Sequence, residues 1–238
     1  FGLGMPGIAL FHPMTHAFFK ALMFLGSGSV IHACHHEQDI FKYGGLRKKM
    51  PITAITFLVG VLAISGVNFL SGYFSKDAIL LSAYNLNMPV FILLYAGAIL
   101  TAIYMFRLYF ITFEGQARSE KASQAHENGS LMTGPLILLA FLSIFAGYHS
   151  FLPLAIVESL IPDIERVAAM PNHLWMIVLG TFAWVAGLIT AKSFYGRVGD
   201  VDPLAQKLPT FYALCRSKLF FDQIYGFYVK QIQDPAAR

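Results

Sequence analysis

Two small sets of ionisable residues lie inside otherwise apolar stretches of this sequence, and these are the residues expected to carry chemistry. His12, His16 and Lys20 form the first set, and Lys76 with Asp77 forms the second. An ionisable group within hydrocarbon is energetically costly and usually marks an ion path or a buried partner. Histidine titrates near neutral pH, so neighbouring groups of this kind can exchange a proton at small energetic cost. The two sets therefore predict a path for protons.

The spacing of the first set places it along one face of a helix. Residues at i, i+4 and i+8 lie about 40° apart in succession and cover about 12 Å of helix length. A single histidine would more simply hydrogen-bond to a neighbouring helix, but three aligned ionisable residues favour a path. Pro13 lies between the two histidines and frees the carbonyl of Ala9, which predicts a kink at that point.

Metal binding is the main chemical alternative for these histidines. The segment HPMTH resembles the spacing of HExxH, but Pro13 stands where the glutamate would be, and no third ligand is suggested nearby. The cluster HACHHE, His32–Glu37, holds enough donor atoms for zinc or copper yet has no recognised ligand spacing. We therefore expect no metal site, and we interpret the second cluster as a solvated loop.

The second set follows an apparent helix break marked by Gly66, Asn68 and Gly72. Irregular backbone at membrane depth persists only where protein or a water-filled cavity supports it. A lysine beside such a break can serve as the protonatable station of a channel, although an interhelical ion pair with a structural role is the alternative. Lys76 and Asp77 are adjacent, so on a helix they point about 100° apart and can have different partners.

The elements that carry these residues are apolar segments. Of the 238 residues, 56% are apolar and 13% are charged, and the mean hydropathy is +0.60. A helix needs roughly 20 apolar residues to cross a bilayer. The apolar segments are Gly7–Ala33, Ile52–Ile64, Phe69–Tyr84, Met88–Phe113, Leu131–Leu152 and His173–Tyr195. They predict an all-α integral membrane protein, a bundle of about six transmembrane helices of which one is discontinuous; the second and third segments form a helix pair or one broken helix.

We expect two domains, a transmembrane helical bundle over residues 1–195 and an amphipathic tail over residues 196–238. In the tail, Lys218–Ile232 alternates aromatic and charged residues and predicts an interfacial helix. The polar connectors are His35–Pro51, Glu114–Ser130 and a short acidic loop with Glu158, Asp163 and Glu165. With six crossings, five Lys and Arg residues fall on the side of the first connector and nine on the side of the tail, which places the tail in the cytoplasm.

Neither end of the chain has the features of a natural terminus, which favours a fragment or a split subunit. The six-crossing arrangement puts the two cysteines, Cys34 and Cys215, on opposite sides, so no disulfide is expected.

Three segments together resemble one family. They are FHPMTHAFFKALMFLGSGSVIHACHHEQDIFKYGGLRKKMP, GYFSKDAIL and LFFDQIYGFYVK. In this order they resemble the carboxyl-terminal half of subunit L of the proton-pumping NADH:quinone oxidoreductase, respiratory complex I, an antiporter-like subunit. The resemblance extends from about Ile8 to Lys230, and the FHxMTHAFFKALxFL and FSKD segments are specific to that family.

The resemblance implies roles for individual residues. His12, His16 and Lys20 would belong to the central hydrophilic axis of the subunit. Lys76 would be the lysine of its broken helix near the outlet half-channel, and Asp77 matches the residue that follows. The family's earlier helices, and its long lateral helix after Lys230, are not in this sequence, so the chain alone should not form a complete proton route. Pro13 replaces the usual leucine, which affects the expected helix geometry.

The function implied is proton translocation driven at a distance by electron transfer in other subunits. The chain would be part of a translocating enzyme without a redox centre of its own: NAD, FMN, iron–sulfur clusters and quinone would be held elsewhere. It has neither a cysteine cluster nor a Gly-rich dinucleotide turn. The expected partners are other membrane-arm subunits, a chain supplying the missing N-terminal helices, and the lipid of an inner (plasma) membrane, with no nucleic acid.

Two alternatives stay open at this point. The large subunit of a multisubunit sodium/proton antiporter resembles the same helices, although HHEQDIFKYGGLRKK and FFDQIY favour complex I. A purely structural scaffold fragment is the other alternative, and it predicts that Lys76→Met leaves pumping intact.

Overall fold

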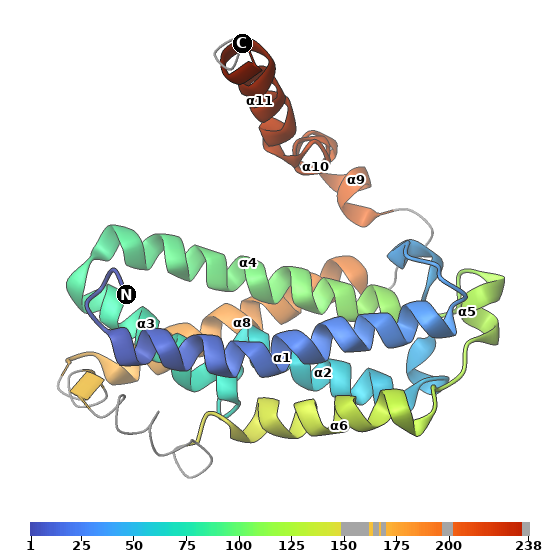
Figure 1. The fold of residues 1–238 in the computed structure, drawn as a ribbon, viewed down its shortest axis with the longest axis horizontal. Helices are drawn as coiled ribbons and strands as arrows, with labels where there is room; N and C mark the ends of the chain where they lie inside the picture. Colours follow the sequence, from blue (N-terminus) through green and yellow to red (C-terminus); the bar gives the residue numbers. More distant parts are fainter. Residues whose placement is uncertain (149–161, 164–166, 168–169, 197–201, 235–238) are drawn as a thin grey trace. The chain divides into compact units, whose positions relative to one another are not determined.

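The computed structural model describes residues 1–148, 162–163, 167, 170–196 and 202–234. All regular elements in that part of the chain are helical (Figure 1). The α-helices are α1 (Pro6–Ala33), α2 (Pro51–Ser65), α3 (Ser71–Leu86), α4 (Met88–Phe113), α5 (Glu120–Gln124), α6 (Ser130–Phe145), α8 (His173–Tyr195), α9 (Pro203–Lys207), α10 (Pro209–Arg216) and α11 (Phe221–Tyr228). Shorter helical turns are η1 (Ile40–Lys42), η2 (Leu46–Lys48), η4 (Lys218–Phe220) and η5 (Val229–Gln233). The chain divides into two compact units, Phe1–Arg197 and Val198–Arg238.

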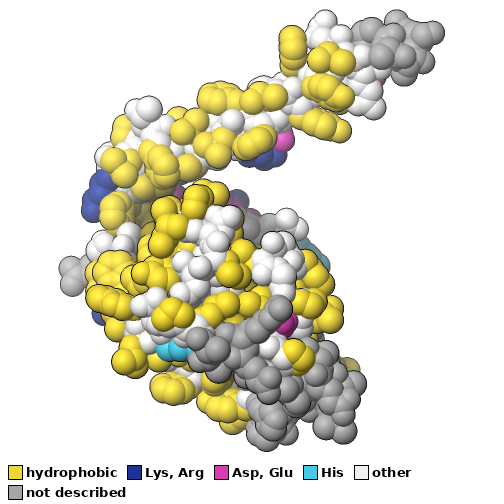
Figure 2. Space-filling model, turned by 90° about the vertical axis from the view of Figure 1, so that its left-hand side faces the viewer, with side chains coloured by type: hydrophobic (Ala, Val, Ile, Leu, Met, Phe, Trp, Pro, Cys, Tyr) yellow, Lys and Arg dark blue, Asp and Glu magenta, His cyan; other side chains and the backbone are white. Residues whose placement is uncertain are grey.

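The helices of the first unit have the length and surface of membrane helices. α1, α4 and α8 are long and apolar enough to cross a bilayer, while α2 and α6 are apolar but shorter. Large apolar side chains such as Phe24, Leu93 and Phe182 point outward and are more than half exposed. Figure 2 shows hydrophobic side chains spread around the outside of this unit. A surface this apolar is suited to lipid rather than to water, and the first unit is therefore a bundle of membrane helices.

The helices α2 and α3 lie one after the other along α1 and run in the opposite direction (Figure 1). Four neighbouring pairs follow one another along α1: Ser29 with Thr53, Met23 with Gly60, Phe19 with Gly72, and His12 with Ser75. The order is continuous from the start of α2 into α3. The two helices are therefore halves of one broken helix that traverses the bundle once. Of the two arrangements that the sequence allowed, a helix pair or one broken helix, the structure has the broken helix.

This arrangement corrects the predicted placement of the polar connectors. Arg47 of the first connector forms an ion pair with Glu114 of the second at 2.9 Å, and Glu127 of the second accepts a hydrogen bond from the Ile52 backbone N–H at 2.7 Å. The two connectors thus lie at the same end of the bundle, whereas the six crossings expected from the sequence would put them on opposite sides, and that expectation is wrong. The error arose because the halves of the broken helix were counted as separate crossings.

The carboxyl end of α8 lies at this end too. The guanidinium of Arg107 stacks on the rings of Phe41 in the first connector and Tyr195 at the end of α8, with 5.6 and 5.0 Å to the ring centroids. The chain consequently leaves the bundle on the side of both polar connectors.

At the opposite end, the amino terminus of α1 is capped from a distant part of the chain. The buried carboxylate of Asp163 accepts hydrogen bonds from the backbone N–H groups of Gly7, at 2.6 Å, and Ile8, at 3.2 Å. A carboxylate there satisfies unpaired N–H groups and the positive end of the helix dipole. The other two acidic residues of that predicted loop, Glu158 and Glu165, lie outside the described residues, as does the carboxyl end of the predicted Leu131–Leu152 span.

The two connectors interlock into one polar cap. The hydroxyl of Tyr43 donates to the backbone carbonyl of Glu37, and burial raises the pKa of Tyr43 to about 12, so this donor stays protonated. Arg118 from the second connector donates to the carbonyls of Phe41 and Ile40 at 2.8 and 3.2 Å. The cap therefore supplies partners for backbone groups that no helix satisfies.

The histidine-rich cluster His32–Glu37 belongs to this cap. His32 Nδ1 lies 2.8 Å from the side-chain oxygen of Asn128, and Glu37 pairs with Lys42 at 3.3 Å. Hydrogen bonds from neighbouring backbone N–H groups, chiefly that of Asp39, lower the pKa of Glu37. Across the described ranges, no three His, Cys, Asp or Glu side chains are grouped so as to hold a metal ion.

Gly44 is the tightest point of the cap, and we expect Gly44→Ala to reduce assembly of the protein in its membrane. Its φ is +106°, and an added Cβ would lie 2.3 Å from the carbonyl oxygen of Gln116. Gly115→Ala is the matched control, because Gly115 has a φ of +80° but no atom within 4 Å of such a Cβ. Both variants carry backbone strain from the positive φ, so the overpacking should make Gly44→Ala about 1–3 kcal/mol more costly than Gly115→Ala. Quantitative blotting of membranes tests this; equal loss in both variants would contradict the close contact.

The second unit is a succession of short helices with exposed apolar side chains. The segment Lys218–Ile232, expected as a single helix, is interrupted: η4 contains Leu219 at a left-handed φ of 55°, and α11 and the π-helical turn η5 follow it. Lys218 pairs with Asp222 at 2.6 Å across this interruption. Cys215 in this unit and Cys34 in the first are both free thiols.

Candidate functional site

The candidate site is built around the end of α2. Gly66 follows the helix with a left-handed φ of 79°, which glycine adopts without steric cost. The backbone N–H groups of Gly66 and Val67 donate to the carbonyls of Ala63 and Leu62, both at 3.1 Å. This pattern is a Schellman motif, and it satisfies two of the carbonyls that the end of a helix leaves unpaired. The carbonyl of Ile64 stays available.

Lys76, on the second turn of α3, uses that carbonyl. Its Nζ donates to the Ile64 oxygen at 2.9 Å. The carboxyl end of α2 carries the negative end of the helix dipole, which attracts a positively charged side chain. Within the described part of the chain Lys76 forms no ion pair. The contact found is therefore with the broken backbone rather than with the carboxylate partner that the structural alternative requires.

A cavity of about 200 Å³ brings four of the five predicted site residues together. It is lined by His12, His16, Phe19, Lys20, Ala63, Ile64, Gly72, Lys76, Thr101 and Tyr104. The first set of ionisable residues and Lys76, 56 positions apart at the nearest member, thus share one space. A volume of this size can hold several water molecules.

Beside this cavity the ring of His12 contacts a hydroxyl group of α3. Its Nδ1 lies 3.0 Å from the hydroxyl oxygen of Ser75, which lies 3.0 Å from the hydroxyl oxygen of Thr15. The Thr15 hydroxyl also donates to the His12 carbonyl at 3.0 Å. Ser75 directly precedes Lys76 in the sequence. Its hydroxyl therefore connects the ring of His12 to the residue next to the lysine.

His16 and Lys20 continue the stripe along α1. The rings of His12 and His16 have centroids 5.8 Å apart, and Lys20 Nζ lies 5.5 Å from the ring centroid of Phe24. α1 continues through Pro13 as one helix from Pro6 to Ala33. The predicted alignment on one face therefore holds across the proline.

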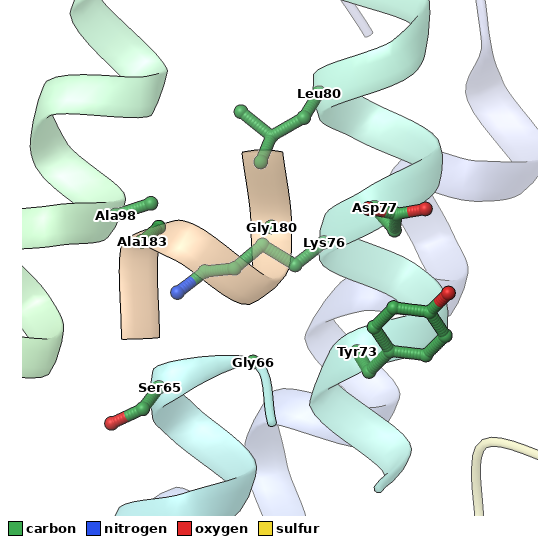
Figure 3. A pocket seen from close by; sticks show the side chains of 9 residues that line it. All are labelled: Ser65, Gly66, Tyr73, Lys76, Asp77, Leu80, Ala98, Gly180 and Ala183. Atoms are coloured by element: carbon green, nitrogen blue, oxygen red, sulfur yellow. The ribbon is translucent and has the colours of Figure 1, made fainter. Parts of the chain in front are cut away.

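Asp77 does not line the larger cavity, and its carboxylate points away from the ammonium of Lys76. Figure 3 shows the ammonium of Lys76 and the carboxylate of Asp77 pointing to opposite sides of α3. An added Cβ on Gly180 of α8 would lie 3.2 Å from Asp77 Oδ1. Both residues line a small cavity of about 10 Å³ that also contacts α8. The expectation of separate directions on one helix agrees with this geometry.

Sequence reasoning missed the residues that connect these groups. Ser75 lies within the FSKD segment, where a small polar residue in an apolar stretch is a usable signal. Thr181 and Trp184 of α8 hydrogen-bond to Asn68 in the break, and nothing in their local sequence indicates it. Asn68 itself was noticed only as a marker of the break.

Fold and site together define a class: a helical membrane protein whose interior carries aligned ionisable side chains at a broken helix. Two family models match the chain. "NADH:quinone oxidoreductase/Mrp antiporter, TM" matches residues 4–104, and "NADH dehydrogenase subunit 5 C-terminus" matches residues 104–233. The chain belongs to the NADH dehydrogenase subunit 5 family, which confirms the resemblance to subunit L.

Named relatives agree with this membership. The chain is similar to the NADH-quinone oxidoreductase subunit L of Rhodobacter capsulatus, with 49% identity over 63% of the chain and 24% of the relative. It is 38% identical to the subunit L of Rickettsia bellii over 96% of the chain and 38% of the relative. It is 41% identical to the subunit L of Escherichia coli K12 over 84% of the chain and 32% of the relative. The chain thus spans less than half the length of these relatives.

Proposed function

We propose that the chain acts as part of a proton-translocating membrane-arm subunit of NADH:quinone oxidoreductase. The observation that carries this proposal is the position of Lys76. Its ammonium binds the carbonyl at a helix break and shares a cavity with His12, His16 and Lys20. Protonatable side chains in one cavity within a membrane bundle are typical of proton relays.

In this proposal the protein's own residues hold and pass protons. Lys76 keeps a proton while its Nζ rests on the Ile64 carbonyl, and it exchanges that proton with the histidines across the cavity. Ser75 links His12 to the same turn of α3. Asp77, on the opposite side of α3, is the acceptor for a proton that leaves the cavity. The direction of transfer would be set by electron transfer in other subunits.

The redox groups of the enzyme would lie outside this chain. We propose that NAD, FMN, the iron–sulfur clusters and the quinone are bound by other subunits, and that this chain contributes to the translocating enzyme only by moving protons. Its partners would be other membrane-arm subunits, the helices that correspond to the rest of its relatives' length, and the lipid bilayer.

We further propose five membrane crossings and a cytoplasmic tail. α1, the broken helix α2–α3, α4 and α8 each account for one crossing, and the chain crosses once more between the start of α6 and the start of α8. Six Lys and Arg residues lie in the two connectors at the end where α8 finishes: Lys42, Arg47, Lys48, Lys49, Arg118 and Lys121. By the positive-inside rule, this end and the tail that follows it lie on the cytoplasmic side of an inner membrane. The exposed apolar residues of α10 and α11 would then lie at the membrane surface.

Sodium/proton exchange is a second candidate, because the first of the two family models covers both kinds of protein. The match of the second model to residues 104–233 favours the respiratory complex.

Affinity purification of the chain from its native membrane, with mass spectrometry of the proteins recovered, tests the proposal. We expect NADH-oxidising and quinone-reducing subunits to be recovered with it. Recovery of small antiporter subunits alone would instead support sodium/proton exchange, and recovery of no partner would contradict both.

A further inference from the structure

The break between α2 and α3 is formed without proline. Residues 66–70 read GVNFL. Gly66 adopts a left-handed φ of 79° easily, but Phe69 adopts one of 69°, which is strained for a residue with a large side chain. A residue held in such a conformation is strained, and it stays there only where surrounding contacts impose it. Those contacts must come from outside the two half-helices.

The side chain of Asn68 provides most of these contacts. Its amide nitrogen and oxygen lie 3.1 and 3.2 Å from the hydroxyl of Thr181, and its oxygen accepts the indole N–H of Trp184 at 3.0 Å. Thr181 and Trp184 are three residues apart, on one face of α8. The carbonyl of the strained Phe69 accepts the Tyr148 hydroxyl at 2.9 Å. The break is thus fastened to α8 by a single amide with both donor and acceptor bonds.

The break and the lysine contact depend on each other. In a continuous helix the Ile64 carbonyl would accept the backbone N–H of residue 68. In the broken form that carbonyl is left for Lys76 Nζ, at 2.9 Å. Any change that lets residues 66–70 return to helical geometry therefore removes the acceptor of the lysine.

We propose that Asn68 is a positioning residue for Lys76: by binding α8 it keeps the helix broken and the Ile64 carbonyl turned to the ammonium. This inference rests on the proposed function, because it assigns Asn68 to the same proton-transfer site. Asn68 itself does not exchange protons with the path. It acts through the geometry of the break.

The test uses the whole complex in its native membrane. Asn68→Leu removes both kinds of hydrogen bond, and Thr181→Val removes one partner while keeping the shape of the side chain. We expect about five- to tenfold slower proton pumping for Asn68→Leu, since small displacements of a reacting group have effects of at least this order, and a smaller loss for Thr181→Val. Thr181→Ser keeps the hydroxyl and should restore pumping.

Tyr95→Phe is the matched control. The Tyr95 hydroxyl donates to the Leu179 carbonyl at 2.9 Å, so this variant also loses a hydrogen bond to α8 but leaves the break untouched. We expect it to pump like the unaltered protein. Slow pumping in Tyr95→Phe equal to that in Asn68→Leu would overturn the inference, because general loosening of α8 would then explain both.

Two further readouts separate positioning from stability. Because Asn68 acts through Lys76, the double variant Asn68→Leu with Lys76→Ala should pump no more slowly than Lys76→Ala alone; additive losses would overturn the inference. Hydrogen–deuterium exchange at the N–H groups of residues 67 to 73 should change in Asn68→Leu and not in Tyr95→Phe.

The outcomes for the two proposals are distinct. If Lys76→Ala slows pumping while Asn68→Leu does not, the proposed function stands and the role of Asn68 is refuted. If Lys76→Ala leaves pumping unchanged, the proposed function fails; altered exchange in Asn68→Leu then supports the anchoring of the break, and unaltered exchange overturns it.

Discussion

Replacing Lys76 with alanine should slow proton pumping by about tenfold or more, the order of effect expected when a positioned proton-transfer group is removed. The complex should still assemble, because the Lys76 side chain borders two cavities and its hydrogen bond within the described part of the chain is to the Ile64 carbonyl. That carbonyl can accept a water molecule from the adjoining cavity once the ammonium is gone. Pumping is measured in sealed membrane vesicles energised with NADH, and assembly by native gels and by NADH oxidation with an artificial electron acceptor.

Lys48→Ala is the matched control for this variant. Lys48 is an exposed lysine of the polar cap, so its loss changes the net charge by the same amount without touching the cavity. We expect no change in pumping. Loss of assembled complex in Lys76→Ala, with pumping per complex unchanged, would show that the lysine is a structural residue and would refute its place in the proton path.

Four of the five residues singled out from the sequence line one cavity. Ionisable residues in apolar segments are conspicuous, and the i, i+4, i+8 spacing of His12, His16 and Lys20 defines a helix face without any knowledge of neighbours. The bounds of α4 and α8 also match the apolar segments residue for residue. These properties are local, because both hydropathy and helical periodicity depend on residues within a few turns. The roles of the five residues in proton transfer stay predictions.

The number of traverses could not be predicted in the same way. Ile52–Ile64 and Phe69–Tyr84 each look like one apolar helix, and hydropathy does not reveal whether the second continues the first or reverses it. The answer depends on how successive residues of both halves meet α1, from Thr53 against Ser29 to Ser75 against His12. The predicted arrangement of the connectors failed for this reason alone.

Hydrogen-bond partners that lie far apart in the sequence also could not be predicted. Asp163 caps α1 from 156 residues away, and Asn68 binds Trp184 across 116 residues. A single polar residue in a loop or an apolar span signals that a partner exists but does not identify it. The carbonyl of Ile64 gives no sequence signal, since any residue can supply a backbone acceptor.

Gly72→Ala should have the most severe effect on the site of any small substitution, lowering both assembly and pumping. Gly72, the second residue of α3, lies directly against the end of α2: an added Cβ would lie 2.0 Å from the carbonyl oxygen of Ala63 and 2.9 Å from its carbonyl carbon. Because these are backbone atoms, no rotation of a side chain relieves the contact. Overpacking of this kind costs about 1–3 kcal/mol or more, and the displacement falls on the break that presents Ile64 to Lys76.

Gly97→Ala on α4 is the control for Gly72→Ala, because an added Cβ there meets no atom within 4 Å and glycine within a helix is otherwise replaced by alanine with some gain in stability. Native gels should show several-fold less assembled complex for Gly72→Ala than for Gly97→Ala, and the complexes that do assemble should pump slowly. Normal pumping by a fully assembled Gly72→Ala complex would mean that the two half-helices can move apart without consequence. Proton transfer would then not depend on the close contact between α2 and α3.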